Sequence, residues 1–206
     1  MALHNQRIAG VTLFLGATGF LLAMNLAEWL YPGYSVSQNT ISDLGATCNS
    51  GVCAIHQPTS IIFNSSVFIL GVLIIVGSFF LYRAYKKKAF SILLILSGIG
   101  AMGVGLFPET FGIIHGIVSL VVFLFGGLAA VASIQILKRP FSYFSVILGL
   151  ITLSALVLYV TGIFLGLGAG GMERLVAYPA LFWGVGLGGY LLSIQESAQS
   201  APTAKT

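Results

Sequence analysis

The stretch TSIIFNSSVFILGVLIIVGSFFLY, residues 59–82, runs for 24 residues without a charge and is followed at once by the basic run RAYKKK, residues 83–88. A helix of about 20 apolar residues crosses a hydrocarbon core of about 30 Å. Basic residues directly after such a helix mark its cytoplasmic end. The stretch therefore predicts a transmembrane helix that ends in the cytoplasm.

Five further apolar segments of comparable length follow the same pattern. The chain is 57% hydrophobic and only 7% charged, whereas soluble proteins average about 25% charged residues. We therefore expect one all-α integral membrane domain over residues 1–206, with a flexible cytoplasmic tail at 195–206. The first apolar run is too long for a signal peptide and is expected to be retained. The six predicted helices span about 8–30, 59–82, 89–107, 112–137, 142–167 and 174–194.

The basic residues set the predicted orientation. Only Arg174 falls on one side of these helices, so the positive-inside rule predicts both termini in the cytoplasm of a multi-pass cell-membrane protein. The 28-residue segment 31–58 then lies outside, with shorter outer connections at 108–111 and 168–173. The net charge of +4 is explained by these helix-end clusters, so no nucleic-acid partner is expected. The residues on the cytoplasmic side are Arg7, Arg83, Lys86, Lys87, Lys88, Lys138, Arg139 and Lys205.

Two cysteines, Cys48 and Cys53, are the only ones in the chain and both fall in the outer segment. An outer compartment permits oxidation, so a small disulfide loop is the expected state. The pair alone is incomplete as a metal site, because four ligands are usual and only His56 is close in sequence.

Small residues recur at four-residue spacing inside the helices, for example Ser97, Ala101 and Gly105. In lipid, this spacing lets helix backbones approach closely. It predicts tight packing within one bundle, with self-association as the alternative.

Polar and titratable residues gather at the predicted outer ends of the helices. Four of the five acidic residues map there, which suggests a polar pocket open to the outer side. Each acid also has a structural explanation, since Thr40-Ile-Ser-Asp43 reads as a capping box and acids near helix starts favour the helix dipole. The predicted pocket residues are Asn39, Ser42, Asn64, Ser119, Glu173 and Arg174, beside the acids Asp43 and Glu109.

His115 is the histidine that falls well within a helix, where a polar side chain is costly and needs a partner or a water-filled cavity. It could act with Asp43 as a general base, with Glu109 as a further acid or base and Ser42 or Ser119 as nucleophile. It could equally be satisfied by a backbone carbonyl or by Asn64.

A metal is the other chemical possibility. The side chains of His56, His115, Asp43 and Glu109 offer suitable nitrogen and oxygen ligands. The chain has no His-Glu-x-x-His, Gly-x-Ser-x-Gly, phosphate-loop or dinucleotide motif, so the sequence identifies no cofactor.

Several short motifs are spread along almost the whole chain. They are Asn39-Thr-Ile-Ser-Asp-Leu-Gly45, Phe63-Asn64, Gly105-Leu-Phe-Pro-Glu109, His115-Gly116, Glu173-Arg174, Tyr178-Pro179 and Trp183. Together they resemble a large prokaryotic membrane family, the domain-of-unknown-function family numbered nine hundred and ninety-eight. The resemblance implies a six-helix membrane fold with recurring polar elements, but supplies no activity. More remotely, the layout is similar to the Frag-like group of eukaryotic membrane proteins, which points toward lipid.

Three classes of function fit these features. The first is a non-catalytic scaffold that binds membrane lipids, or a subunit that packs against other membrane proteins or copies of itself. The alternative is a membrane-embedded hydrolase or transferase that acts on a lipid or lipid-linked substrate through Asp43 and His115. A small-solute transporter comes third, because no charged residue falls near the predicted bilayer centre.

Overall fold

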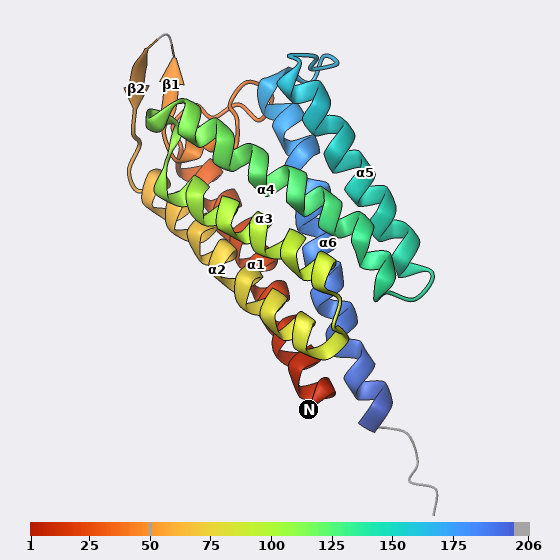
Figure 1. The fold of residues 1–206 in the computed structure, drawn as a ribbon. Helices are drawn as coiled ribbons and strands as arrows, with labels where there is room; N and C mark the ends of the chain where they lie inside the picture. Colours follow the sequence, from red (N-terminus) through yellow and green to blue (C-terminus); the bar gives the residue numbers. More distant parts are fainter. Residues whose placement is uncertain (50, 200–206) are drawn as a thin grey trace, which may run out of the picture.

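The structure is a computed structural model that describes the backbone of residues 1–49 and 51–199 and the side chains as far as Ser193. It is an all-α bundle, and six of its described helices are long and apolar enough to cross a membrane (Figure 1). The predicted fold class is therefore confirmed. The long helices are α1 (Ala2–Leu30), α2 (Thr59–Tyr85), α3 (Lys88–Leu106), α4 (Ile113–Ala132), α5 (Phe141–Val160) and α6 (Gly168–Gln199).

Short elements connect the helices. Three 3-10 turns, η1 (Ser42–Leu44), η2 (Glu109–Phe111) and η3 (Ser133–Gln135), lie between them, together with the strands β1 (Thr47–Asn49) and β2 (Val52–Ala54). The two strands pair antiparallel, with Cys48 opposite Cys53. These two cysteines form a disulfide with an S–S distance of 2.03 Å, as predicted.

The helices form a closed ring. Each helix packs on the next in sequence, and α6 packs on both α5 and α1. Glycines allow some of the closest approaches, because a Cβ at Gly71 would lie 2.5 Å from the carbonyl oxygen of Gly98, and one at Gly188 would lie 2.6 Å from the backbone nitrogen of Phe14. The small residues therefore serve contacts within the bundle, one of the two uses predicted for them.

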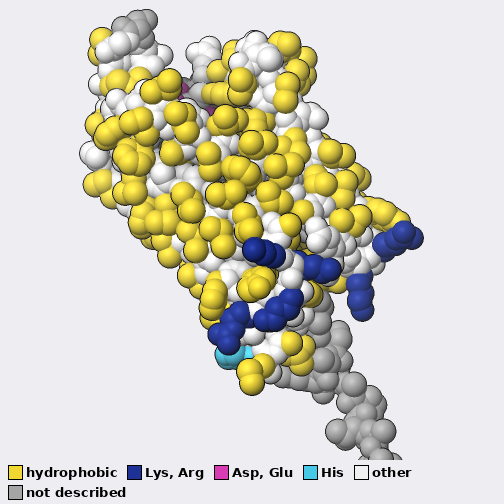
Figure 2. Space-filling view, in the orientation of Figure 1, with side chains coloured by type: hydrophobic (Ala, Val, Ile, Leu, Met, Phe, Trp, Pro, Cys, Tyr) yellow, Lys and Arg dark blue, Asp and Glu magenta, His cyan; other side chains and the backbone are white. Residues whose placement is uncertain are grey.

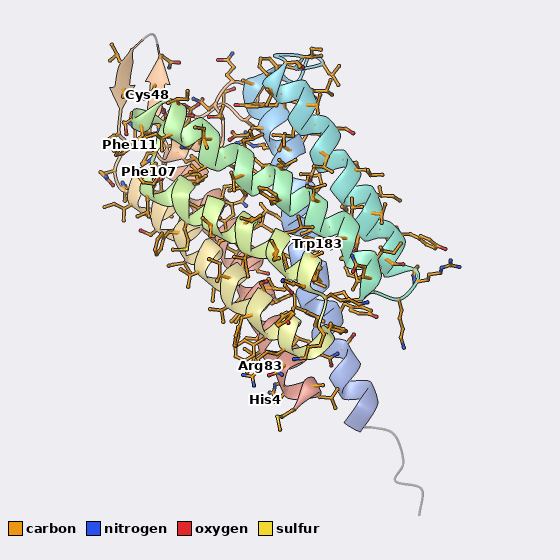
Figure 3. The ribbon with its side chains drawn as sticks, in the orientation of Figure 1. His4, Cys48, Arg83, Phe107, Phe111 and Trp183 are labelled. Atoms are coloured by element: carbon orange, nitrogen blue, oxygen red, sulfur yellow. A yellow bond between two sulfur atoms is a disulfide. The ribbon has the colours of Figure 1, made fainter. Side chains whose placement is uncertain are left out.

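The two ends of the bundle differ in charge. Lys and Arg side chains gather at the end where α1 begins, while the β1–β2 hairpin projects from the other end (Figures 1 and 2). Arg83 and His4 lie at the first end, and Cys48, Phe107 and Phe111 lie near the second (Figure 3). From the positive-inside rule we expect the basic end to lie in the cytoplasm. We call the opposite end the outer end.

Some helix boundaries were predicted wrongly. Helix α5 ends at Val160 rather than near 167, and α6 begins at Gly168 rather than at 174. Gly162 and Gly166 between them, and Gly168 at the start of α6, adopt positive φ, which breaks the helix. The predicted connection 168–173 is therefore the first part of α6, and Glu173 lies inside a helix.

Two further boundaries also differ. Helix α1 begins at Ala2 rather than near residue 8, and α4 gives way to η3 after Ala132. Helix α6 continues to Gln199, past the start of the tail predicted at 195. The rest of that predicted tail, residues 200–206, lies outside the described residues.

Candidate functional site

The segment 40–46 after α1 begins with a reciprocal cap. The Asp43 Oδ2 atom accepts a hydrogen bond from the Thr40 backbone N at 2.8 Å, and Thr40 Oγ1 accepts one from the Asp43 backbone N at 3.0 Å. This is the capping box that the sequence predicted, and it starts η1. Asn39 Nδ2 donates a further bond to Asp43 Oδ2 at 3.2 Å. The Asp43 carboxylate is therefore engaged within its own turn.

Segment 40–46 is inserted into the outer end of the bundle, and we call it the plug. Ile41 and Leu44 are only 4% and 1% exposed. Ser60 Oγ donates to the Gly45 carbonyl at 2.6 Å, and Asn64 Nδ2 donates to Ser60 Oγ at 3.1 Å. A Cβ at Gly45 would lie 2.5 Å from Asn64 Oδ1. The predicted pocket residue Asn64 therefore holds the plug against α2.

Arg174 on α6 fixes the outer segment from the other side. Its guanidinium donates to the carbonyls of Val36 at 2.9 Å and Asn39 at 3.1 Å. It also donates to Glu28 Oε1 at 2.5 Å and to the Tyr34 hydroxyl at 2.6 Å. Burial raises the pKa of Tyr34, so its hydroxyl keeps its proton and donates it to the Thr40 carbonyl at 2.7 Å. We call Arg174 and these hydrogen-bond partners the clamp. In the clamp, the predicted pocket residues Asn39 and Arg174 hold the outer segment in place.

Glu173, the neighbour of Arg174, contacts the plug itself. Its carboxylate accepts hydrogen bonds from the Ile41 backbone N and from Ser42 Oγ, the latter at 2.9 Å. Glu173 and Ser42 are buried, at 6% and 8% exposed. The serine thereby becomes the link between α6 and α4.

His115, in the first turn of α4, completes this line of polar groups. Its Nδ1 lies 2.8 Å from the Phe107 carbonyl oxygen, which can only accept, so Nδ1 carries the proton. Nε2 of the neutral ring is then an acceptor, 3.1 Å from Ser42 Oγ and 3.3 Å from Ser119 Oγ. Ser42 has a single hydroxyl proton, which goes either to Glu173 or to Nε2, so Ser119 is the donor to Nε2 while Ser42 donates to Glu173. The line runs Phe107 O, His115, Ser42, Glu173. The Phe107 carbonyl accepts the Nδ1 proton of His115, so the buried histidine is satisfied by a backbone carbonyl. This is one of the two structural explanations given above.

A pocket of about 340 Å³ borders these groups, between α4, α5 and α6. Figure 2 shows a hollow at the outer end, with acidic side-chain atoms at its floor. The polar lining residues are Ser42, Glu109, His115, Ser119, Tyr159 and Glu173.

Glu109, in η2, is the titratable group of the pocket that lies outside the helices. Burial, and then the nearby carboxylates of Asp43 and Glu173, raise its pKa to about 7. Two long hydrogen bonds offset this in part, from Thr40 Oγ1 at 3.3 Å and from the Cys48 backbone N at 3.4 Å. Glu109 therefore exchanges its proton near neutral pH.

The structure brings together most, but not all, of the predicted site. Ser42, Ser119, Glu173, Glu109 and His115 share the pocket, whereas Asn39, Asn64 and Arg174 hold the loop. Asp43 is not among the hydrogen-bond partners of His115; the acid that reaches the histidine, through Ser42, is Glu173.

The proposed metal ligands do not assemble. Among the described residues, no three His, Cys, Asp or Glu side chains lie close enough to hold a metal ion. His56 instead packs its ring against Tyr31, with centroids 4.5 Å apart. The physical reason is that His56 precedes α2 and stays on the loop, while Asp43 is held in its capping box.

Two contributors were missed from the sequence. The Phe107 carbonyl carries no side-chain signal. Tyr159 lies in an apolar helix, where a tyrosine near a helix end is as well explained by the membrane interface. Only the convergence of α4, α5 and α6 brings Tyr159 to the pocket.

These features define a multi-pass membrane protein with a polar pocket near the outer ends of its helices. A family model described as "Protein of unknown function (DUF998)" matches residues 14–189. The chain belongs to this family, as the motifs indicated. Searches of curated proteins and of solved structures each found no match.

Proposed function

We propose that the protein is a lipid-binding membrane module that receives the head group of an amphiphile in the outer pocket. The observation that carries this proposal is the pocket of about 340 Å³ with polar groups on its floor, set between membrane-spanning helices. Ligand pockets of this size, with a few convergent polar groups, are typical of small-molecule sites.

The residues at the edge of the outer pocket favour a ligand that comes from the membrane. Gly116 and Leu120 on α4 and Val160 on α5 line the pocket and are exposed. Because both helices are apolar spans, these exposed lining residues face lipid. An amphiphile can enter here without leaving the bilayer.

The charges on the pocket restrict the head group. Two carboxyl groups, Glu109 and Glu173, line it, and no Lys or Arg is among its lining residues. The nearest cation along the chain, Arg174, is committed to the clamp. A phosphate or carboxylate head group would be repelled, whereas hydroxyls or an amine would find acceptors in the carboxylates and the histidine. The expected ligand class is a neutral or cationic amphiphile.

The test is native mass spectrometry of the purified protein with a saturated monoacylglycerol and with the lysophosphatidate of the same chain. We expect retention of the monoacylglycerol, weak retention of the lysophosphatidate, and at least a tenfold loss of monoacylglycerol on His115→Ala. The matched control is Asn25→Ala, because in the described part of the chain the Asn25 side chain hydrogen-bonds only within α1, at 2.7 Å to the Leu21 carbonyl. Equal retention by His115→Ala and wild type would contradict the proposal.

A second candidate function is favoured by one distance, the 3.1 Å between Ser42 Oγ and His115 Nε2. This is the geometry of a nucleophile and its base, with the Phe107 carbonyl orienting the ring. In such an acyl hydrolase or transferase, Nε2 would take the serine proton as Oγ attacks an ester carbonyl, and would return that proton to the departing alcohol. The residue pair would be Ser42 and His115, rather than Asp43 and His115 as the sequence suggested.

Labelling with a fluorophosphonate separates this candidate from simple binding. Covalent modification of Ser42 that is lost in His115→Ala and kept in Ser119→Ala would support the enzyme. A protein that binds monoacylglycerol and is never labelled would be a binding module only.

A further inference from the structure

Tyr159 is a polar residue of the outer pocket whose hydroxyl is not used within the protein. It lies in the last turn of α5, lines the pocket and is half-buried. Its ring packs against Phe164, with centroids 5.9 Å apart, whereas none of the described residues hydrogen-bonds to its hydroxyl. The hydroxyl of a buried tyrosine usually has a hydrogen-bond partner. This group is therefore available to a ligand.

The other side-chain donors of the pocket are already engaged. Ser42 Oγ donates to the Glu173 carboxylate at 2.9 Å. Ser119 Oγ donates to His115 Nε2 at 3.3 Å. The Nδ1 atom of the same histidine donates to the Phe107 carbonyl at 2.8 Å. Each hydroxyl and the neutral imidazole has one proton to donate, so none of them can serve a ligand without breaking a hydrogen bond within the protein.

Two carboxyl groups near Tyr159 have no hydrogen bond to it. Glu109 and Glu173 both lie within electrostatic range of the Tyr159 hydroxyl, yet neither accepts a hydrogen bond from it. The Glu109 carboxylate receives only two long hydrogen bonds, at 3.3 and 3.4 Å, so it can accept further donors. A ligand placed between these groups would therefore need hydroxyl or amine donors for the carboxylates and a separate acceptor for the tyrosine.

Tyr159 is also next to the lipid-facing part of the pocket lining. Its neighbour Val160 lines the pocket and is exposed on an apolar span. In a bound amphiphile the head group faces the acids and the hydrocarbon faces lipid, so the linkage between them falls where the polar lining gives way to the apolar lining. An ester or amide linkage presents a carbonyl oxygen there, which is a stronger acceptor than an ether oxygen.

We propose that Tyr159 is a specificity-determining residue that donates a hydrogen bond to the linkage carbonyl of the bound amphiphile. The ligand class is thereby narrowed to neutral or cationic amphiphiles with an ester or amide linkage, such as a monoacylglycerol or an N-acyl ethanolamine. Alkyl amines and alkyl glycerol ethers lack this carbonyl. The inference rests on the proposed function and adds the chemistry of the linkage.

The test compares a monoacylglycerol with the alkyl glycerol ether of the same chain length, by native mass spectrometry of the full-length protein at pH 8. At this pH Glu109, whose pKa is about 7, is mostly ionised and cannot donate in place of the tyrosine. Wild type should retain the ester about fivefold over the ether, which corresponds to about 1 kcal/mol, the net value of one hydrogen bond. Tyr159→Phe removes only the hydroxyl and should retain both lipids equally.

The matched control is Tyr143→Phe, at the inner end of the same helix, where the ring centroid lies 5.1 Å from the Arg139 guanidinium carbon. It should keep the preference for the ester. Equal retention of the two lipids by wild type, an ester preference that survives in Tyr159→Phe, or loss of both lipids from that variant would overturn the role of Tyr159 while leaving the outer pocket as a lipid site. Retention of neither lipid by wild type would overturn the proposed function itself.

Discussion

Glu173 and Arg174 are adjacent on α6, yet they belong to two regions of opposite character. Successive residues on a helix point about 100° apart, so one side chain enters the clamp and the other reaches the pocket. The Arg174 guanidinium is enclosed by Glu28, Tyr34 and three backbone carbonyls. The polar groups beside Glu173 border about 340 Å³ of space.

The difference separates structural from functional burial of polar groups. In the clamp, the two terminal nitrogens of the buried Arg174 guanidinium have partners supplied by the protein, while its Nε has none among the described residues. The role of this charge is therefore to hold the outer segment in place. In the pocket, several polar groups face a space that a ligand can fill. Burial of an ionisable residue alone therefore does not identify a site; the open space beside it does.

The largest effect is expected from breaking the clamp. The Glu28 side chain is only 15% exposed, and Arg174→Met leaves it without its ion-pair partner. The substitution also removes the donor to the Val36 and Asn39 carbonyls. Loss of one partner of a buried pair costs about 3 to 5 kcal/mol, so the midpoint of thermal unfolding in detergent should fall sharply. The unfolding midpoint of Arg174→Lys should lie between those of wild type and Arg174→Met. A midpoint of Arg174→Met equal to that of wild type would show that the clamp is not structural.

A smaller loss of stability is expected at the plug. Gly45→Ala would bring a Cβ to 2.5 Å from Asn64 Oδ1, and such overpacking costs about 1 to 3 kcal/mol. Thermal unfolding of Gly45→Ala, Asn64→Ala and the double variant measures the energetic coupling between the two positions. The double variant should be more stable than the sum of the two single effects predicts, and strict additivity would argue against this contact.

Ser42→Ala tests whether the polar groups of the pocket contribute less to stability than the clamp does. It removes one hydroxyl between Glu173 and His115, so the expected loss of stability is about 1 kcal/mol, well below that of the clamp variant. Monoacylglycerol retention should nevertheless fall clearly. A variant that unfolds as readily as Arg174→Met would show that the pocket line is structural too.

An effect of a different kind, which depends on pH, is expected at Glu109. Its folded pKa is raised from 4.5 to about 7, so the folded state binds the proton more tightly than the unfolded chain does. The group therefore costs stability above pH 7, and this cost disappears as the pH falls from 7 to 4.5. Glu109→Gln should raise the unfolding midpoint at pH 8 and leave it unchanged at pH 4.5. A gain that is the same at both pH values would contradict the titration.

Local sequence patterns determined much of this protein. The six spans, the gathering of basic residues at one end of the bundle, the capping box at Thr40 and Asp43 and the Cys48–Cys53 disulfide all follow from residues close together in the chain. Hydrophobicity, charge and capping act over one helix or one turn, so they can be predicted without knowing the fold. The helix ends at Val160 and Gly168 could not, because apolar glycine-rich sequence continues through the break.

Only the tertiary structure decided which polar groups meet. Ser42 lies 73 residues from His115 and 131 from Glu173, and their contact depends on how the plug enters the ring of helices. The same holds for the division of Glu173 and Arg174 between pocket and clamp. The sequence predicted that these residues lie at a similar membrane level, but the partners of a side chain are set by helix rotation and loop path, which are properties of the whole packed bundle.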